Sequence, residues 1–345
     1  MRFTALLFLL IPAAASQQQS PIPQARQLEA AKRFEDANEL LSNYVHRNPK
    51  DAAVWTELGR VQLQQQLSDD AMHSFAAALA IDPQLPPARE GEVKAAVASA
   101  LADRSAGDNN AALSCLVQAR KLVPDSPELL TDFGIQADSM QIYEDADKAL
   151  TQARQLAPNN PRVLYALAHV ELDEQKMAEA EANLRAYLKI RPSDASAHYG
   201  LGHLLHMMAR DDEARAELEH SIALQPHQTE SYYELGEIAL QMRQEAEARG
   251  DYGKVLAIDP RHGGALTGMG ILAFRAKDYA AADKYLSEAV LCAPDYVAAH
   301  HYYALTLAQL GRTQDAAREA ALATSLRQQQ DKLRHGYFLI TPPAH

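Results

Sequence analysis

Three histidines of this sequence, His169, His203 and His206, have a spacing at which they could bind a metal ion together. His203 and His206 lie three residues apart, which places both imidazoles on one face of a helix, and His169 precedes His203 by 34 residues. Imidazoles in such an arrangement can share a zinc ion. Glu237, 34 residues after His203, is the nearest carboxylate by this spacing. The pattern predicts a surface histidine pair or, as the alternative, a metal-dependent binder or enzyme that uses His169, His203 and His206.

Prolines recur with the same 34-residue spacing as His169 and His203, and they indicate a repeated structure that positions these histidines. Their successive intervals are 34, 41, 34, 34, 34, 34 and 34 residues: Pro49, Pro83, Pro124, Pro158, Pro192, Pro226, Pro260 and Pro294. A fixed period of this size is typical of a solenoid, in which each repeat contacts only its neighbours. The period therefore predicts a single elongated array.

Each repeat has the pattern of two helices. With the closing proline at place 32, apolar residues at places 4, 7, 8 and 11 share one helical face, and those at places 20, 24 and 27 share a second. Place 8 is glycine or alanine in most units, and place 20 is alanine in all nine, which indicates a steric limit where two helices meet. Four side chains are candidate helix N-caps: Asp51, Ser126, Asn160 and Asp194.

The third repeat departs from this pattern because its proline interval is seven residues longer than the others. Its first helix is predicted from about Pro87 to Leu101. The polar stretch Asp103–Asn109, which contains Gly107, is predicted to be an enlarged loop between the two helices.

The repeats resemble the tetratricopeptide repeat, whose pattern is W-x2-L-G-x2-Y, then A-x3-F, then a late proline. The second unit carries the matching residues Trp55, Leu58, Gly59, Ala71, Phe75 and Pro83. The resemblance implies an all-α, right-handed superhelical solenoid of about nine helix–turn–helix repeats. The predicted organisation is a signal peptide (1–16), a repeat array (17–334) and a C-terminal tail (335–345), with units at about 18–51, 52–85, 86–126, 127–160, 161–194, 195–228, 229–262, 263–296 and 297–330.

The resemblance also implies where a partner would bind. In this family the first helices line a concave groove that usually takes a peptide or a helix of another protein. Places 2, 5, 9, 12 and 13 should face it, and they carry aromatic and imidazole side chains favoured at interfaces. The family's lysine–asparagine clamp for a C-terminal carboxylate is missing. The predicted groove residues are Tyr165, Tyr199, Tyr233, His169, His203, His206, Glu237 and Phe274.

Composition and termini narrow the function classes. The net charge of −12 disfavours nucleic acid as a partner, because that affinity rests on lysine and arginine. Residues 1–16 combine Arg2, an apolar core and an A-x-A sequence, which predicts a signal peptide and an exported, periplasmic or secreted protein. The apolar run Phe3–Ala15 is shorter than the ~20 residues that span a bilayer, so no membrane span is expected in the mature chain. Cys115 and Cys292 are expected to be buried and unpaired.

These observations favour an interaction scaffold over an enzyme. The sequence contains no Walker, zincin or nucleophile-elbow motif, and no segment outside the repeats could hold a catalytic domain. No cofactor is expected. The predicted function is an exported scaffold that binds a peptide or helix of a partner protein, with assembly of an envelope complex as one setting for it.

Overall fold

The computed structural model describes the backbone of residues 20–340 and the side chains of residues 20–330. All secondary structure in this range is helical, which confirms the all-α solenoid. The predicted signal peptide, residues 1–16, lies outside the described residues. Among the described helices, none is both long enough and apolar enough to cross a membrane.

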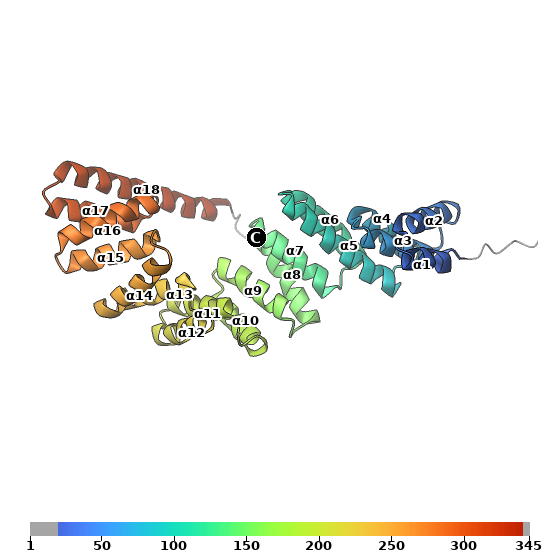
Figure 1. Cartoon of the computed structure of the whole chain (residues 1–345), viewed down its shortest axis with the longest axis horizontal. Coiled ribbons are helices and arrows are strands. Elements are labelled where there is room, and N and C mark those ends of the chain that lie inside the picture. Colours follow the sequence, from blue (N-terminus) through green and yellow to red (C-terminus); the bar gives the residue numbers. More distant parts are fainter. Residues whose placement is uncertain (1–19, 341–345) are drawn as a thin grey trace, which may run out of the picture. The chain divides into compact units, whose positions relative to one another are not determined.

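Eighteen helices in the described range form nine successive pairs (Figure 1). The first helices of the pairs are α1 (Ile22–Ala30), α3 (Ala52–Gln64), α5 (Pro86–Ser105), α7 (Pro127–Ser139), α9 (Pro161–Asp173), α11 (Ala195–Met207), α13 (Thr229–Gln241), α15 (Gly263–Arg275) and α17 (Val297–Gln309). The second helices are α2 (Phe34–Arg47), α4 (Ser68–Ile81), α6 (Asn109–Leu122), α8 (Tyr143–Leu156), α10 (Met177–Ile190), α12 (Asp211–Leu224), α14 (Glu245–Ile258), α16 (Tyr279–Cys292) and α18 (Thr313–Ile340).

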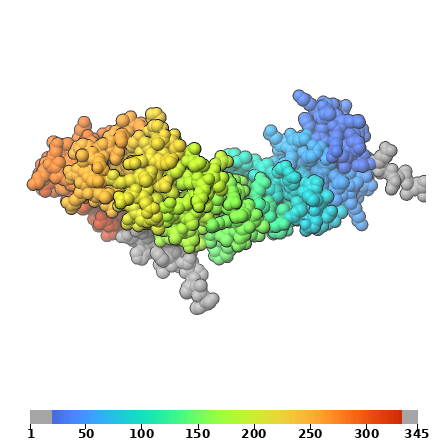
Figure 2. Space-filling view, turned by 90° about the horizontal axis from the view of Figure 1, so that it is seen from below, coloured from blue at the N-terminus to red at the C-terminus, as the bar shows by residue number. Residues whose placement is uncertain are grey.

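The helices group into two compact units. Unit 1 comprises Met1–Pro158 and contains α1 to α8; unit 2 comprises Asn159–His345 and contains α9 to α18. Within each unit, a helix packs against its hairpin partner and the hairpins stack on one another. Figure 2 shows consecutive repeats of unit 2, coloured from yellow-green to orange, in contact along the surface. All predicted groove residues belong to unit 2.

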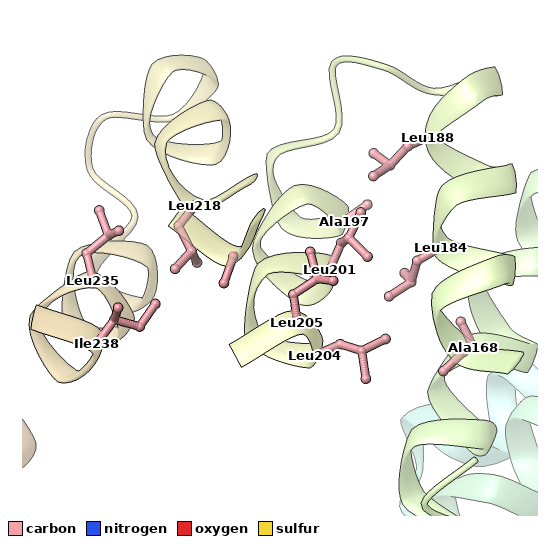
Figure 3. Packing of buried hydrophobic residues seen from close by; sticks show 12 residues of the cluster. Ala168, Leu184, Leu188, Ala197, Leu201, Leu204, Leu205, Leu218, Leu235 and Ile238 are labelled. Atoms are coloured by element: carbon pink, nitrogen blue, oxygen red, sulfur yellow. The ribbon is translucent and has the colours of Figure 1, made fainter. Parts of the chain in front are cut away.

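Small residues bring the helices of each hairpin together. The place-20 alanines are completely buried from Ala37 to Ala282, as the sequence pattern predicts. At place 8, a Cβ added to Gly202 would lie 2.7 Å from Cγ of Leu218, so glycine leaves the space that the leucine fills. Leu218 and Leu201 belong to one continuous apolar cluster of unit 2 (Figure 3).

Two repeats carry an aromatic side chain at place 24, and each requires a second glycine. Phe75 lies against Gly59 of its own repeat and against Gly91 of the next, where added Cβ atoms would approach its ring to 2.9 and 2.2 Å. Tyr252 lies in the same way between Gly236 and Gly268. Gly268 and Gly270 therefore both serve helix packing, against Tyr252 and Leu286.

Helix ends follow the predicted signals. The side chains of Asp51, Ser126, Asn160 and Asp194 each accept a backbone N–H of the first helical turn, which satisfies a donor that has no partner within the helix. The turn between paired helices uses one left-handed residue in every repeat, including Gln66 at φ 61°. These four caps are thus confirmed.

The enlarged loop predicted at Asp103–Asn109 is wrong. Helix α5 has 20 residues and continues to Ser105, whereas the other first helices from α3 to α17 have 13. Only Ala106–Asp108 connect α5 to α6, with Gly107 as the left-handed residue at φ 82°. Seven residues make about two helical turns, so the insertion lengthens the helix and keeps its apolar face in phase.

The two cysteines are free, as expected. They are half-buried rather than fully buried. Cys115 Sγ donates to the carbonyl of Ala112 at 3.1 Å within its own helix, which is compatible with a structural thiol.

Candidate functional site

A cavity of about 680 Å³ opens on the first helices of unit 2, and we call it the tyrosine pocket. Its lining comes from helices α9 and α11, from Leu184 of α10, and from the turn before α13 together with the first residues of α13. Four of the predicted groove residues meet here, from two successive repeats. The lining residues are Tyr165, Ala168, His169, Leu172, Leu184, Ser196, Tyr199, Gly200, His203, Gln225, His227, Gln228, Thr229 and Glu230.

The two tyrosines are held differently. The ring of Tyr165 lies 5.1 Å from that of Tyr187, whose hydroxyl donates to Asp194 at 2.5 Å. Tyr165 nevertheless keeps 40% of its surface exposed. Tyr199 is half-buried and packs against the apolar cluster of unit 2, with its ring 6.1 Å from His203. Tyr165 therefore offers more surface to a ligand, and Tyr199 is packed against the apolar cluster of unit 2.

His203 connects the pocket to an acidic helix face. Its Nδ1 donates to Glu234 Oε1 at 2.9 Å, and this hydrogen bond raises the pKa of His203 above its ordinary value. Burial, together with the charges of Glu234 and Glu230, raises the pKa of the Tyr199 hydroxyl. Burial is the larger cause for Tyr199 and the hydrogen bond to Glu234 the larger cause for His203, and the charge of Glu234 contributes to both pKa shifts.

The three histidines do not converge on one metal site. His203 bonds to Glu234, His206 Nδ1 donates to Asp211 at 2.7 Å, and His169 Nδ1 lies 3.8 Å from Asp173. Within the described residues, neither His203 nor His206 belongs to a set of three potential ligand atoms within 4.8 Å of one another. The geometry thus gives the metal-dependent alternative no shared site on these histidines.

Tyr233 lies outside the pocket and is half-buried. An added Cβ at Gly264 would lie 2.7 Å from its ring, so the ring covers the next helix rather than standing in the groove. Burial raises the pKa of its hydroxyl far above the usual value, and the charge of Glu237 adds to this effect. Truncation of Tyr233 is therefore expected to remove packing against the next helix.

Glu237 and Phe274 also lie away from the pocket. The Tyr252 hydroxyl donates a hydrogen bond to Glu237 Oε1 at 2.6 Å, and burial raises the pKa of that carboxyl. Phe274 packs against Tyr279 and Tyr302, with ring centroids 5.7 and 6.0 Å away. Both residues therefore contribute to the packing of later repeats.

Sequence reasoning missed several lining residues. Ser196 and Glu230 stand at place 2, a predicted groove-facing place whose residues were not singled out. Leu184 comes from a second helix and His227 from an inter-repeat turn, and no pattern in the first helices points to either. Gly200 also lines the pocket, and no atom lies within 4 Å of its Cβ position. The absence of a side chain there leaves the pocket open and is not required for helix packing.

Family comparison identifies the repeats. Tetratricopeptide repeat profiles match residues 22–86, 131–195, 171–237, 229–262 and 267–330, which together make up more than half of the chain. The chain belongs to the tetratricopeptide repeat family. The unmatched stretch, residues 87–130, contains most of the 20-residue helix α5. No curated protein sequence matches the chain.

Solved structures show the same fold at low identity. Pseudomonas aeruginosa pilF is 19% identical with a TM-score of 0.55, over 64% of this chain and 99% of that one. The APC/C hetero-tetramer Cut9–Hcn1 is 14% identical with a TM-score of 0.54, over 90% of this chain and 61% of the other. MamA is 23% identical with a TM-score of 0.45, over 48% of this chain and 91% of that one. The repeat fold supports a protein–protein interaction scaffold.

Proposed function

We propose that this chain is an exported, non-enzymatic scaffold that holds a peptide or helix of a partner protein in the tyrosine pocket, in the assembly of an envelope complex. The observation that supports this most is the pocket itself. It combines an exposed tyrosine, a tyrosine packed on the apolar cluster, and leucine side chains in one pocket. Such sites bind segments with little loss of conformational entropy in the scaffold.

Export rests on residues 1–16 and has a direct test. The mature protein should begin near Ser16 or Gln17 and be recovered in the envelope or secreted fraction. N-terminal sequencing of the protein from its native cell checks this. Soluble cytoplasmic protein that retains Met1 would contradict export while leaving the pocket untouched.

Tyr165 provides the test of partner binding. Truncation of a central interface tyrosine typically costs about 2 kcal/mol, so Tyr165→Ala should weaken capture of partners from the native envelope fraction about thirtyfold. His301→Ala is the matched control, because His301 stands at the same place of a later first helix, is exposed and lies outside the pocket.

Both variants should unfold close to wild type, as Tyr165 keeps much of its surface exposed. Equal capture by wild type and by Tyr165→Ala would show that partners bind elsewhere on the protein.

A further inference from the structure

Among the first helices of unit 2, α13 carries an excess of negative charge, whereas α11 and α17 contain no charged residue other than histidine. Helices α11, α13 and α17 contain no lysine or arginine. Helix α13 instead presents Glu230, Glu234 and Glu237 at i, i+4 and i+7, which lie along one helical face. On the second helices several acids pair with arginines; Glu181, for example, lies 2.7 Å from Arg210. Glu234 is paired with His203 and Glu237 accepts from the Tyr252 hydroxyl, so Glu230 is the exposed carboxylate on this face of α13.

This negative face borders the tyrosine pocket. Glu230 is exposed, lines the pocket and accepts a hydrogen bond from Thr229 Oγ1 at 3.2 Å. Glu234 holds His203 on the adjoining wall. No lysine or arginine lines the pocket among the residues that the structure describes.

A basic side chain has the chemistry to fill this site. The methylene stem of a lysine or arginine packs on apolar surface while its charged end stays near solvent. Leu172 and Leu184 supply such surface, and tyrosine faces attract cations. An acidic side chain would meet Glu230 as a like charge.

On the basis of the proposed function, we propose that the partner segment is basic: a lysine or arginine side chain enters the tyrosine pocket, packs between Tyr165 and Tyr199, and pairs with Glu230. A neutral apolar segment and an acidic segment are the competing occupants. The three occupants predict different orders of affinity for one series of peptides.

The test uses three fluorescein-labelled peptides, Ser-Gly-Leu-X-Leu-Gly-Ser, in which X is lysine, glutamine or glutamate. Fluorescence anisotropy with the full-length mature protein at pH 8 should give about tenfold tighter binding of the lysine peptide than of the glutamine peptide, and the weakest binding for glutamate. Glu230→Gln should reduce the preference for lysine about threefold to fivefold, in the range of an exposed ion pair. Glu179→Gln, which removes an exposed acid on α10, should leave it unchanged.

Equal binding of the lysine and glutamine peptides, tighter binding of the glutamate peptide, or no saturable binding of the lysine peptide would each overturn the proposal. An equal loss of preference in Glu230→Gln and Glu179→Gln would overturn it too, because it would mean that only net charge matters. The proposed function fails separately, if Tyr165→Ala captures partners as well as wild type does.

Discussion

Replacing Glu92 by glutamine is expected to stabilise unit 1 more at pH 8 than at pH 4. The difference in free energy of unfolding between the variant and wild type should be about 3 kcal/mol more favourable to the variant at pH 8. Glu92 stands in α5 with 1% of its surface exposed, and its Oε2 has no hydrogen-bond partner. Burial raises the pKa of this carboxyl from 4.5 to about 7. An ionised carboxylate is costly in such a site, and glutamine cannot ionise.

The sign follows from proton linkage. Below pH 4.5 the carboxyl is protonated in both the folded and the unfolded chain, so it contributes no pH dependence. Between pH 4.5 and about 7 the unfolded chain loses the proton first, and stability falls as pH rises. Above the folded pKa the loss is complete, at about 1.4 kcal/mol per pKa unit.

Urea denaturation of both proteins at several pH values, followed by circular dichroism, measures this difference. Glu39→Gln removes an exposed carboxylate from the same unit and should stay within about 0.5 kcal/mol of wild type throughout. A constant difference between wild type and Glu92→Gln from pH 4 to pH 8 would show that the carboxyl is not held neutral by the fold.

The architecture could be predicted because it depends on periodic contacts between sequence neighbours. Alanine at place 20 is buried in every repeat, and glycine at place 8 lies against the side chain at place 24 of the same repeat, so sequence spacing predicts the packing. The long helix α5 could not be predicted in the same way. Gly107 and the polar residues before it read as a loop, but the seven extra residues extend the helix by two turns and only tertiary packing decides between these outcomes.

The site was predictable in part. The 34-residue period correctly brings Tyr165 and Tyr199 into one pocket with His169 and His203. The same period places Tyr233 on that face. The period predicts the direction of the side chain, but it does not predict how much space the following helix leaves for the ring. Gly264 leaves room for the ring of Tyr233 to lie against α15, and the tyrosine becomes part of the packing.

Filling the tyrosine pocket should abolish partner binding without harming the fold. Gly200 lines the pocket on α11, and its Cβ position has open space around it, so Gly200→Trp should place an indole in the cavity. Tryptophan also favours a helix more than glycine does, by about 0.5 kcal/mol, so stability should not fall. The matched control is Gly253→Trp on α14, where the Cβ position is equally open but outside the pocket.

The most direct measurement of the central claim compares wild type, Gly200→Trp and Gly253→Trp as mature baits in the native envelope fraction, with captured proteins quantified by mass spectrometry. We expect capture by Gly200→Trp to fall at least tenfold, capture by Gly253→Trp to match wild type, and all three proteins to unfold at or above the wild-type midpoint. A folded Gly200→Trp protein that captures the wild-type set of partners in full would contradict the assignment of partner binding to this pocket.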